Sequence, residues 1–221
     1  MQQEIFSFER IEKLDWSSFI EGAENRSAIE YLVNWPNWSN NGLIIHGNSG
    51  VGKTHLMHLW SQTANAQFVT KKNAPSDPRN LFSEDVNFIF DNFDDFLQPE
   101  NFDWLFHFIN IAREKQKFFI LVSRVQPSLW KINLDDLRSR ILALPSVQIR
   151  NPGDELLFKI AQKLCDDVGI SIRENTLNFI LKRIDRQVNS VAKLLEILNK
   201  LSLQDQKKIT IQFIQNHAEL L

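Results

Sequence analysis

The middle of the chain contains short apolar runs that are separated by longer amphipathic segments. Three of these runs, at 43–46, 86–91 and 117–123, are mostly apolar and do not alternate regularly with polar residues. Such runs are typical of strands that are buried on both faces of a parallel sheet. Weaker runs at 67–70 and 147–150 predict two more strands, so that we expect five in all.

The segments between these runs carry apolar residues at the three- and four-residue spacing of a helix face. They predict helices over 24–35, 53–64, 102–115 and 134–142, with Pro36 closing the first of them. A regular alternation of strands and helices is characteristic of α/β proteins. The fold class that we predict is therefore α/β, with a parallel five-stranded sheet flanked by helices.

The character of the sequence changes after an Asn-Pro-Gly turn. Residues 154–221 show three or four helical segments and no convincing strand, and Asp154 is predicted to cap the first of these helices. We therefore expect an exposed arm at 1–14, an α/β domain at 15–152 and a small all-helical domain at 153–221.

The charged residues are nearly balanced, with 25 Lys and Arg against 27 Asp and Glu and a net charge of −2. A dedicated nucleic-acid-binding domain usually carries a basic excess, so this balance argues against one. Trp35 and Trp38 are accordingly interpreted as packing residues rather than as platforms for base stacking. The sequence carries no signal peptide, no apolar stretch of membrane-spanning length and only one cysteine, Cys165, so we expect a cytoplasmic protein with no membrane partner.

The strongest chemical signal is a glycine-rich loop between the run at 43–46 and the helix that follows it. It matches the pattern G-x-x-x-x-G-K-[S/T] at every fixed position, with the residues Gly47, Asn48, Ser49, Gly50, Val51, Gly52, Lys53 and Thr54. Glycines allow backbone N–H groups to converge on a phosphate, and the N-terminus of the helix adds partial positive charge. Lys53 is expected to bind the β- and γ-phosphates, and Thr54 to offer its hydroxyl to Mg²⁺.

A phosphate loop of this kind also needs a carboxylate that holds the magnesium ion. Asp91 follows an apolar strand, and we predict that it shares the ion with Thr54 and belongs to the catalytic centre. Efficient ATPases usually have a second acid directly after it, which orients the attacking water, but this chain has Asn92. An amide can hydrogen-bond water, yet it carries no negative charge to polarise it. We therefore predict nucleotide binding with slow intrinsic hydrolysis, for which Asp94 or Asp95 could compensate in part.

Five segments together resemble the branch of AAA+ proteins that contains the bacterial initiator DnaA and its relative Hda. Residues 47–56, with their Lys-Thr-His-Leu ending, resemble the phosphate loop of this family, and 19–26 resemble the segment that wraps the adenine. Residues 90–92 read Phe-Asp-Asn, which is closer to Hda than to most ATPases. Residues 137–140 resemble the box that carries the arginine finger, and 184–186 resemble the start of the second sensor helix of the lid. The resemblance covers nearly the whole chain.

The resemblance implies further residues of the nucleotide site, namely Phe19, Ile20, His55, Ser123 and Arg186. Ser123 would reach the γ-phosphate or a water molecule, whereas Arg124 stands where the family usually has an acid and is expected at the surface or at an interface. The lid position that usually senses phosphate holds Asn189, and Arg186 one turn earlier would compensate in part. ADP or ATP, bound with Mg²⁺, is then expected as a structural cofactor and not as fuel.

Arg140 is the predicted arginine finger, which would act in trans. A guanidinium group that reaches across a subunit boundary stabilises negative charge on a transferred phosphoryl group. Arg138 is its rival within the same segment. The alternative interpretation is a surface arginine that pairs with Asp135 or Asp136 on its own helix.

Within the family, the resemblance favours Hda over DnaA. DnaA continues into a helix-turn-helix domain that binds DNA, whereas this sequence ends with the lid. Hda-like proteins also carry an N-terminal peptide that binds the sliding clamp, and Gln3, Phe6 and Phe8 offer its glutamine and apolar anchors. A second register would use Gln2 and Ile5, and the alternative is a terminus that packs on its own core.

The resemblance therefore implies an Hda-like regulator of replication initiation. The DNA polymerase III β sliding clamp, loaded on DNA, would hold the arm while the protein stimulates hydrolysis of DnaA-bound ATP. Its partners would be DnaA and the clamp, and it would reach DNA only through the clamp. It would then be located at the nucleoid, and it could form a homodimer. Two alternatives are an independent AAA+ ATPase of the helicase-loader or transposition-helper type, acting on single-stranded DNA, and a nucleotide-stabilised adaptor without hydrolysis.

Overall fold

The computed structural model describes Trp16 and residues 19–38 and 40–217. The predicted arm residues Gln3, Phe6 and Phe8 lie outside the described residues. The described chain divides into two compact units. Residues 23–150 form the α/β unit, and residues from 151 onward, with those described up to Gly22, form the helical unit.

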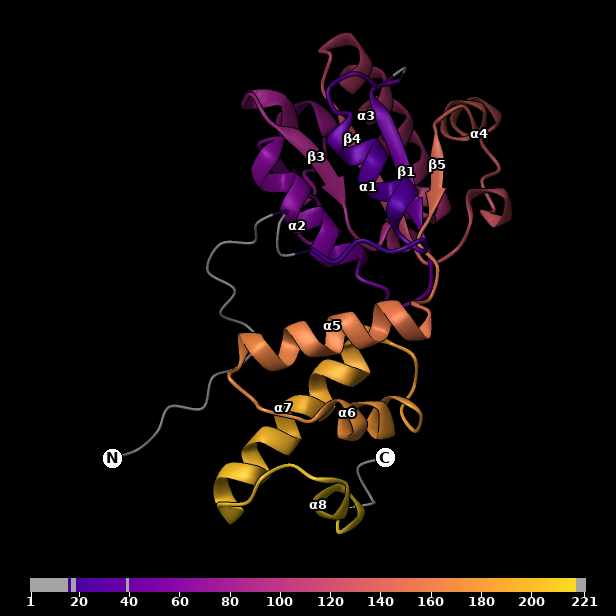
Figure 1. Cartoon of the computed structure of the whole chain (residues 1–221). Coiled ribbons are helices and arrows are strands. Elements are labelled where there is room, and N and C mark those ends of the chain that lie inside the picture. The colour runs from indigo at the N-terminus through magenta and orange to yellow at the C-terminus, as the bar shows by residue number, and fades with distance from the viewer. Residues whose placement is uncertain (1–15, 17–18, 39, 218–221) are drawn as a thin grey trace. The chain divides into compact units, whose positions relative to one another are not determined.

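The α/β unit is built around a five-stranded parallel sheet with the strand order β2-β3-β4-β1-β5 (Figure 1). The strands are β1 (Gly42–His46), β2 (Ala66–Phe68), β3 (Asn87–Phe90), β4 (Phe119–Ser123) and β5 (Ser146–Gln148). In the centre of the sheet, β1 pairs with β4 so that Ile44 lies beside Leu121. The prediction of an α/β fold with a parallel five-stranded sheet is confirmed, and the expected strand boundaries differ by one or two residues.

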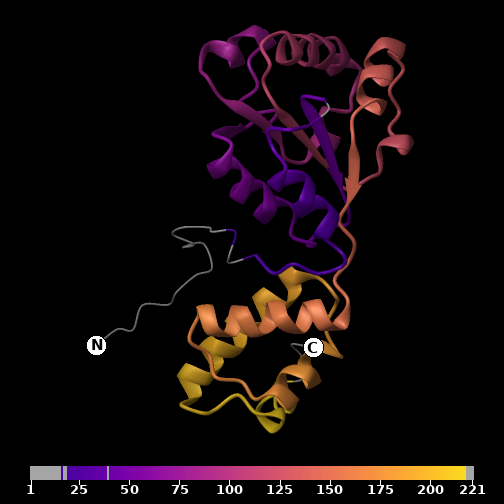
Figure 2. The same cartoon turned by 45° about the horizontal axis from the view of Figure 1, so that its top comes forward.

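Helices cover both faces of this sheet, which explains why β1, β3 and β4 are apolar without alternation (Figure 2). The helices are α1 (Arg26–Val33), α2 (Lys53–Thr63), α3 (Phe102–Glu114) and α4 (Asp135–Leu142). Four short 3₁₀ helices lie in the connections, at Pro78–Ser83, Phe93–Phe96, Pro99–Asn101 and Pro127–Leu129. On the face that α3 covers, the Phe108 ring lies 4.8 to 5.5 Å from the rings of Phe88, Phe90 and Phe119.

Three tryptophans from α2 and from the segment before β1 pack against one another. Trp60 of α2 is 0% exposed, and Trp38 stacks on it at 5.6 Å with an interplanar angle of 12°. Trp35 meets Trp60 edge-on at 6.2 Å, and both Trp35 and Trp38 contact Phe118. The interpretation of Trp35 and Trp38 as packing residues is confirmed.

Within the described residues, the helical unit consists of helices without a strand, as predicted. They are α5 (Asp154–Asp167), α6 (Glu174–Leu181), α7 (Val188–Asp205) and α8 (Ile211–Gln215). The helix α5 packs on both α6 and α7, and its Leu157 and Cys165 share one core with Leu195 and Phe213. Among the residues that the structure describes, no helix is both long and apolar enough to cross a membrane.

The predicted cap of α5 by Asp154 is wrong. The cap position is Gly153, in extended conformation, and Asp154 is already the first residue of the helix. An acid in the first turn is favourable there because it faces the positive end of the helix dipole. The carboxylate of Asp154 also forms an ion pair with Arg186, at 3.1 Å from Nη2.

Candidate phosphate-binding site

The glycine-rich loop joins the end of β1 to the start of α2, and its first glycine admits no side chain. At Gly47 the backbone φ is 156°, and a Cβ there would lie 2.2 Å from the carbonyl oxygen of Ile149. Gly52, directly before α2, has a φ of 94°, which other residues adopt only with strain. The loop therefore follows a path that glycine alone allows at Gly47, and its next two residues, Asn48 and Ser49, are exposed.

The side chain of Lys53 folds back toward the loop and contacts its backbone. Its Nζ donates hydrogen bonds to the carbonyl oxygens of Gly47, at 2.6 Å, and Asn48, at 2.7 Å. Partial burial lowers the pKa of Lys53, the positive charge of Arg124 lowers it further, and the carboxylates of Asp91 and Asp94 oppose this shift. Because the ammonium group is partly withdrawn from water, its attraction to a phosphate in the loop is less screened than at an open surface.

The two predicted magnesium ligands lie side by side. The Thr54 hydroxyl donates a hydrogen bond of 2.8 Å to Oδ2 of Asp91, and the backbone N–H of Asn92 donates to Oδ1 of the same carboxylate at 3.1 Å. A hydroxyl beside a carboxylate is a pair of oxygen ligands that suits Mg²⁺. Asn92 itself has a left-handed backbone, with a φ of 58°, and is exposed.

Ser123 and Asp94 form a second polar group at the end of β4. The Ser123 side chain is buried, and its Oγ lies 2.8 Å from both Asp94 Oδ1 and the Val125 carbonyl oxygen, while it accepts from the Val125 N–H at 2.9 Å. The other oxygen of Asp94 accepts from the backbone N–H of Arg124 at 2.9 Å. Asp94 is therefore bound on both oxygens, whereas Asp95 is exposed.

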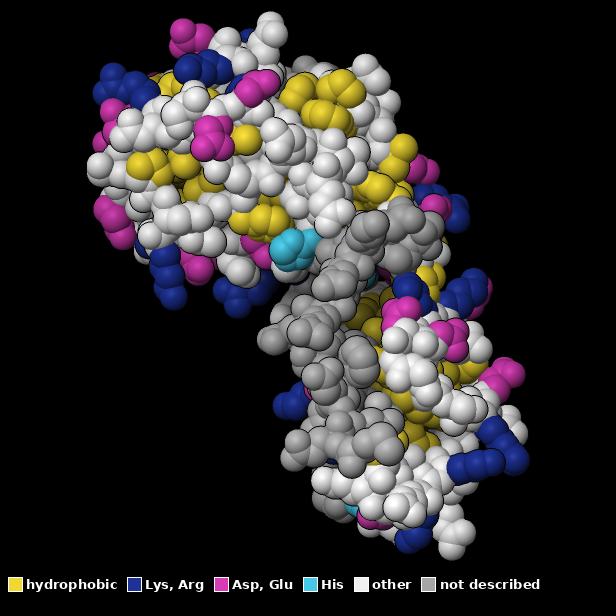
Figure 3. Space-filling model, turned by 90° about the vertical axis from the view of Figure 1, so that its left-hand side faces the viewer, with side chains coloured by type: hydrophobic (Ala, Val, Ile, Leu, Met, Phe, Trp, Pro, Cys, Tyr) yellow, Lys and Arg dark blue, Asp and Glu magenta, His cyan; other side chains and the backbone are white. Residues whose placement is uncertain are grey.

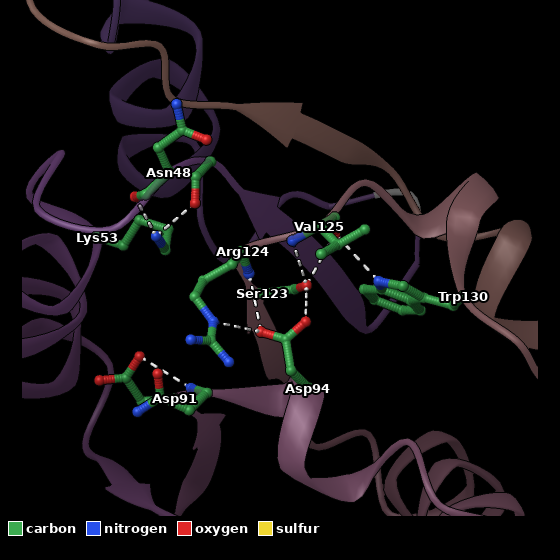
Figure 4. Close-up of polar contacts among 10 residues, drawn as sticks. Asn48, Lys53, Asp91, Asp94, Ser123, Arg124, Val125 and Trp130 are labelled. Atoms are coloured by element: carbon green, nitrogen blue, oxygen red, sulfur yellow. Dashed lines mark hydrogen bonds and ion pairs between the residues drawn. The ribbon is translucent and has the colours of Figure 1, made fainter.

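Arg124 belongs to this group of charges, although its sequence position did not assign it to the site. Arg124 is exposed, as expected, and in addition its charge acts on Lys53 and its Nε lies 3.6 Å from Oδ2 of Asp94 (Figure 4). The signal that could have found it is its position directly after β4, which pairs with the strand that enters the loop.

Two known families match separate parts of the chain. The family described as the bacterial DnaA ATPase domain matches residues 11–92, and the family described as the Hda lid domain matches residues 154–217. The chain is an Hda/DnaA-like AAA+ protein. The two matches fall in the order that the sequence predicted, with the phosphate loop in the first region and the helices in the second.

Similar proteins agree with this family. An uncharacterized protein of Haemophilus influenzae is 28% identical over 189 residues, which are 80% of this chain and 80% of that protein. The initiator DnaA of Cutibacterium acnes is 26% identical over 202 residues, which are 81% of this chain and 40% of that protein. This Hda/DnaA-like chain thus spans less than half of the initiator.

Solved structures show the same fold. Domain III of the replication initiation protein DnaA from Thermotoga maritima superimposes with a TM-score of 0.76 at 20% identity, over 90% of this chain and 93% of that one. AMPPCP-bound DnaA from Aquifex aeolicus gives a TM-score of 0.73 at 21% identity, over 91% of this chain and 67% of that one.

In this Hda/DnaA-like protein, the predicted finger Arg140 lies in the last turn of α4. Its guanidinium carbon lies 5.0 Å from the centroid of the Phe106 ring, as in a cation–π contact. Among the described residues it forms no ion pair, so the alternative pairing with Asp135 or Asp136 is not formed. Arg138 is more exposed than Arg140.

Three predicted nucleotide residues belong to the helical unit and not to the unit that carries the loop. They are Phe19, Ile20 and Arg186. Their part in the site stays a prediction, as does that of His55, which is half-buried in the first turn of α2. In the helical unit Arg186 is paired with Asp154, and Asn189 lies near the start of α7.

The surface charge is mixed on the one face of the α/β unit that is shown in space-filling form. On the face that Figure 3 shows, basic and acidic side chains are interspersed over the α/β unit, and they do not gather into one large basic area. An interspersed surface of this kind gives little of the electrostatic attraction on which sequence-independent nucleic-acid binding depends.

Proposed function

We propose that this protein binds ADP or ATP through its glycine-rich loop. The observation that supports this most is the contact between Thr54 and Asp91, which sets a hydroxyl and a carboxylate at 2.8 Å beside the lysine of the loop. The two oxygens would hold Mg²⁺, which neutralises phosphate charge when it is bound, and Lys53 would exchange its two carbonyl partners for phosphate oxygens. The similar structure of DnaA from Aquifex aeolicus, which is bound to AMPPCP, supports an adenine nucleotide.

We propose further that the protein hydrolyses its own nucleotide slowly. Asn92 replaces the acid that would polarise water, and its amide carries no charge. Asp94, the nearest substitute along the chain, already accepts hydrogen bonds on both oxygens from Ser123 and Arg124. A carboxylate that is engaged in this way is a poor base for a water molecule, so the nucleotide would serve as a regulatory or structural cofactor.

The chemistry that we propose for the protein therefore takes place on a partner. The match of the Hda lid family over residues 154–217 supports an Hda-like regulator, which would stimulate hydrolysis of ATP bound to DnaA. Arg140 would supply the guanidinium group: it is half-buried against Phe106 and has no acidic partner among the described residues. The arm residues Gln3, Phe6 and Phe8 would bind the β sliding clamp, and the protein would reach DNA only through that clamp.

A phosphate-release assay tests this proposal. ATP-bound DnaA is mixed with DNA-loaded clamp and with the wild type, Arg140→Ala or the matched control Arg138→Ala from the same helix. We expect stimulation by the wild type and by Arg138→Ala, and a loss on the order of 10³-fold in the Arg140→Ala mixture. Full stimulation by Arg140→Ala would exclude Arg140 as the finger.

The same assay separates the other functions. Rapid phosphate release by this protein alone, stimulated by single-stranded DNA, would indicate an independent ATPase. Absence of release in every mixture, with nucleotide binding intact, would indicate an adaptor. Clamp binding is measured separately with Gln3→Ala and Phe6→Ala variants, for which we expect a loss of affinity without a change in nucleotide binding.

A further inference from the structure

Arg124 lies beside the candidate nucleotide site, and its guanidinium group makes only a long contact with Asp94. Its Nε lies 3.6 Å from Oδ2 of Asp94, which is long for an ion pair, and 60% of its side chain is exposed. Asp94, by contrast, is fixed: 16% of its side chain is exposed, and both of its oxygens accept short hydrogen bonds from the end of β4. The acid is therefore a rigid anchor and the guanidinium group a movable partner.

The sheet places this guanidinium group beside the phosphate loop. Ser123 is the register partner of His46, so the next residues along the two strands, Arg124 and Gly47, leave the sheet side by side. The Ser123 carbonyl oxygen also accepts the Gly47 N–H at 3.2 Å. Figure 4 shows the Arg124 side chain directed from the end of β4 into the region of Lys53 and the acids.

Four charged groups thus converge at the carboxyl ends of three adjacent strands. Lys53 and Arg124 supply two positive charges, and Asp91 and Asp94 supply two negative charges. The charges of Arg124, Asp91 and Asp94 all act on the ammonium group of Lys53. A magnesium ion at Asp91 would neutralise one of the acids. Lys53 and Arg124 would then face the phosphate chain together.

We propose that Arg124 is a ligand of the terminal phosphate of a nucleoside triphosphate, acting within its own subunit and exchanging its long contact with Asp94 for that phosphate. This inference rests on the proposed nucleotide binding. The loop N–H groups at the N-terminus of α2 would bind the inner phosphates, which leaves the terminal phosphate toward the ends of β3 and β4. A guanidinium group binds phosphate through two parallel hydrogen bonds, which is stronger than its long contact with Asp94. Arg124 would thereby distinguish a triphosphate from a diphosphate.

Binding titrations with Mg²⁺ and either ADP or the non-hydrolysable triphosphate AMPPCP test this role. We expect Arg124→Ala to weaken AMPPCP binding by about tenfold or more and to leave ADP binding within about twofold of the wild type. Arg124→Lys should recover part of the AMPPCP affinity, because it keeps the charge but not the planar fork. The matched control is Arg113→Ala, an exposed arginine in the last turn of α3, which should change neither affinity.

Asp94→Asn tests the anchor independently. An asparagine can still accept one of the hydrogen bonds from the end of β4, but it no longer attracts the guanidinium group, so AMPPCP should bind more tightly and ADP should be nearly unaffected. Thermal melts of each variant verify that it is folded. An equal loss of ADP and AMPPCP affinity in Arg124→Ala would indicate a purely structural role, and no loss of either would indicate a surface residue. If the wild type binds neither nucleotide, the proposed function itself fails.

Discussion

The hydroxyl of Thr54 donates a hydrogen bond of 2.8 Å to the carboxylate of Asp91, although 37 positions separate the two residues in the sequence. The contact joins the first turn of α2 to the end of β3, so that the two oxygens lie within reach of a single ion. We therefore expect Thr54→Ala to lower the Mg²⁺-dependent part of the nucleotide affinity by about tenfold or more. Thr54→Ser, which keeps the hydroxyl, should remain near the wild type. A titration of ADP with and without Mg²⁺ measures this, and equal Mg²⁺ dependence in all three proteins would contradict it.

Gly47 and Gly52 should differ in their tolerance of a methyl group. Both have positive φ, which costs an alanine about 1–2 kcal/mol, but only at Gly47 would the added Cβ also meet a backbone atom, the carbonyl oxygen of Ile149 at 2.2 Å. We expect Gly52→Ala to lower the free energy of unfolding of the α/β unit by about that strain, and Gly47→Ala to lower it by distinctly more. Urea unfolding followed by circular dichroism compares the two. Equal losses would mean that the loop moves away from Ile149 at little cost.

His46, the last residue of β1, should make the protein less stable at mildly acid pH. Partial burial lowers its pKa, and the neighbouring charge of Lys53 lowers it further. Below the ordinary histidine pKa of about 6.5, the unfolded chain therefore takes up a proton that the folded chain resists, and stability falls. Between about pH 7.5 and about pH 5.5 the melting temperature of the wild type should fall more than that of His46→Gln.

The carboxylates of the chain titrate in both proteins, so the difference between the two melting curves isolates His46. Above the ordinary histidine pKa, where the imidazole is neutral in the folded and in the unfolded chain, the two curves should have the same slope, and below it the wild-type curve should fall more steeply. Parallel curves across the whole range would show that His46 is as free to accept a proton in the folded protein as in the unfolded one.

Cys165 should react slowly with thiol reagents in the folded protein. Burial in the core of the helical unit raises the pKa of its thiol to about 11, with a smaller contribution from Asp166. At about pH 8 only about one thiol in a thousand is then the reactive thiolate. The reaction with Ellman's reagent should be slow in buffer and fast in concentrated urea. Because Cys165 is the single cysteine, one signal reports on this unit alone, and an immediate reaction in buffer would mean that the core around Cys165 opens readily.

The parts of the fold that local patterns determine could be predicted from the sequence. The apolar runs located the strands to within one or two residues, since strands that are buried on both faces carry few polar residues. The loop at 47–54 was recognisable because its glycines, Lys53 and Thr54 have fixed spacing. Asp91 was recognisable because it is the carboxylate that ends the apolar run 86–91.

The features that were missed depend on which strands become neighbours. The contact between Asp94 and Arg124 spans the ends of β3 and β4, and no local pattern states that these two ends meet. The cap of α5 was misassigned to Asp154 because an acid is suitable both at the cap and in the first turn, and only the backbone angles distinguish the two positions. The packing of Arg140 on Phe106 likewise joins two helices that are far apart in the sequence.

The adjacency of β3, β4 and β1 has a consequence for how this protein can diverge. Main-chain hydrogen bonds hold parallel strands about 4.8 Å apart whatever side chains they carry, so the starting points of the loop, of Asp91 and of Arg124 are set by the backbone. Mutation can thus exchange the residue that follows Asp91, or the one that follows Ser123, without displacing the rest. The sheet therefore tolerates substitutions of single residues in the site. This tolerance accounts for an architecture that is shared with Thermotoga maritima DnaA at 20% identity.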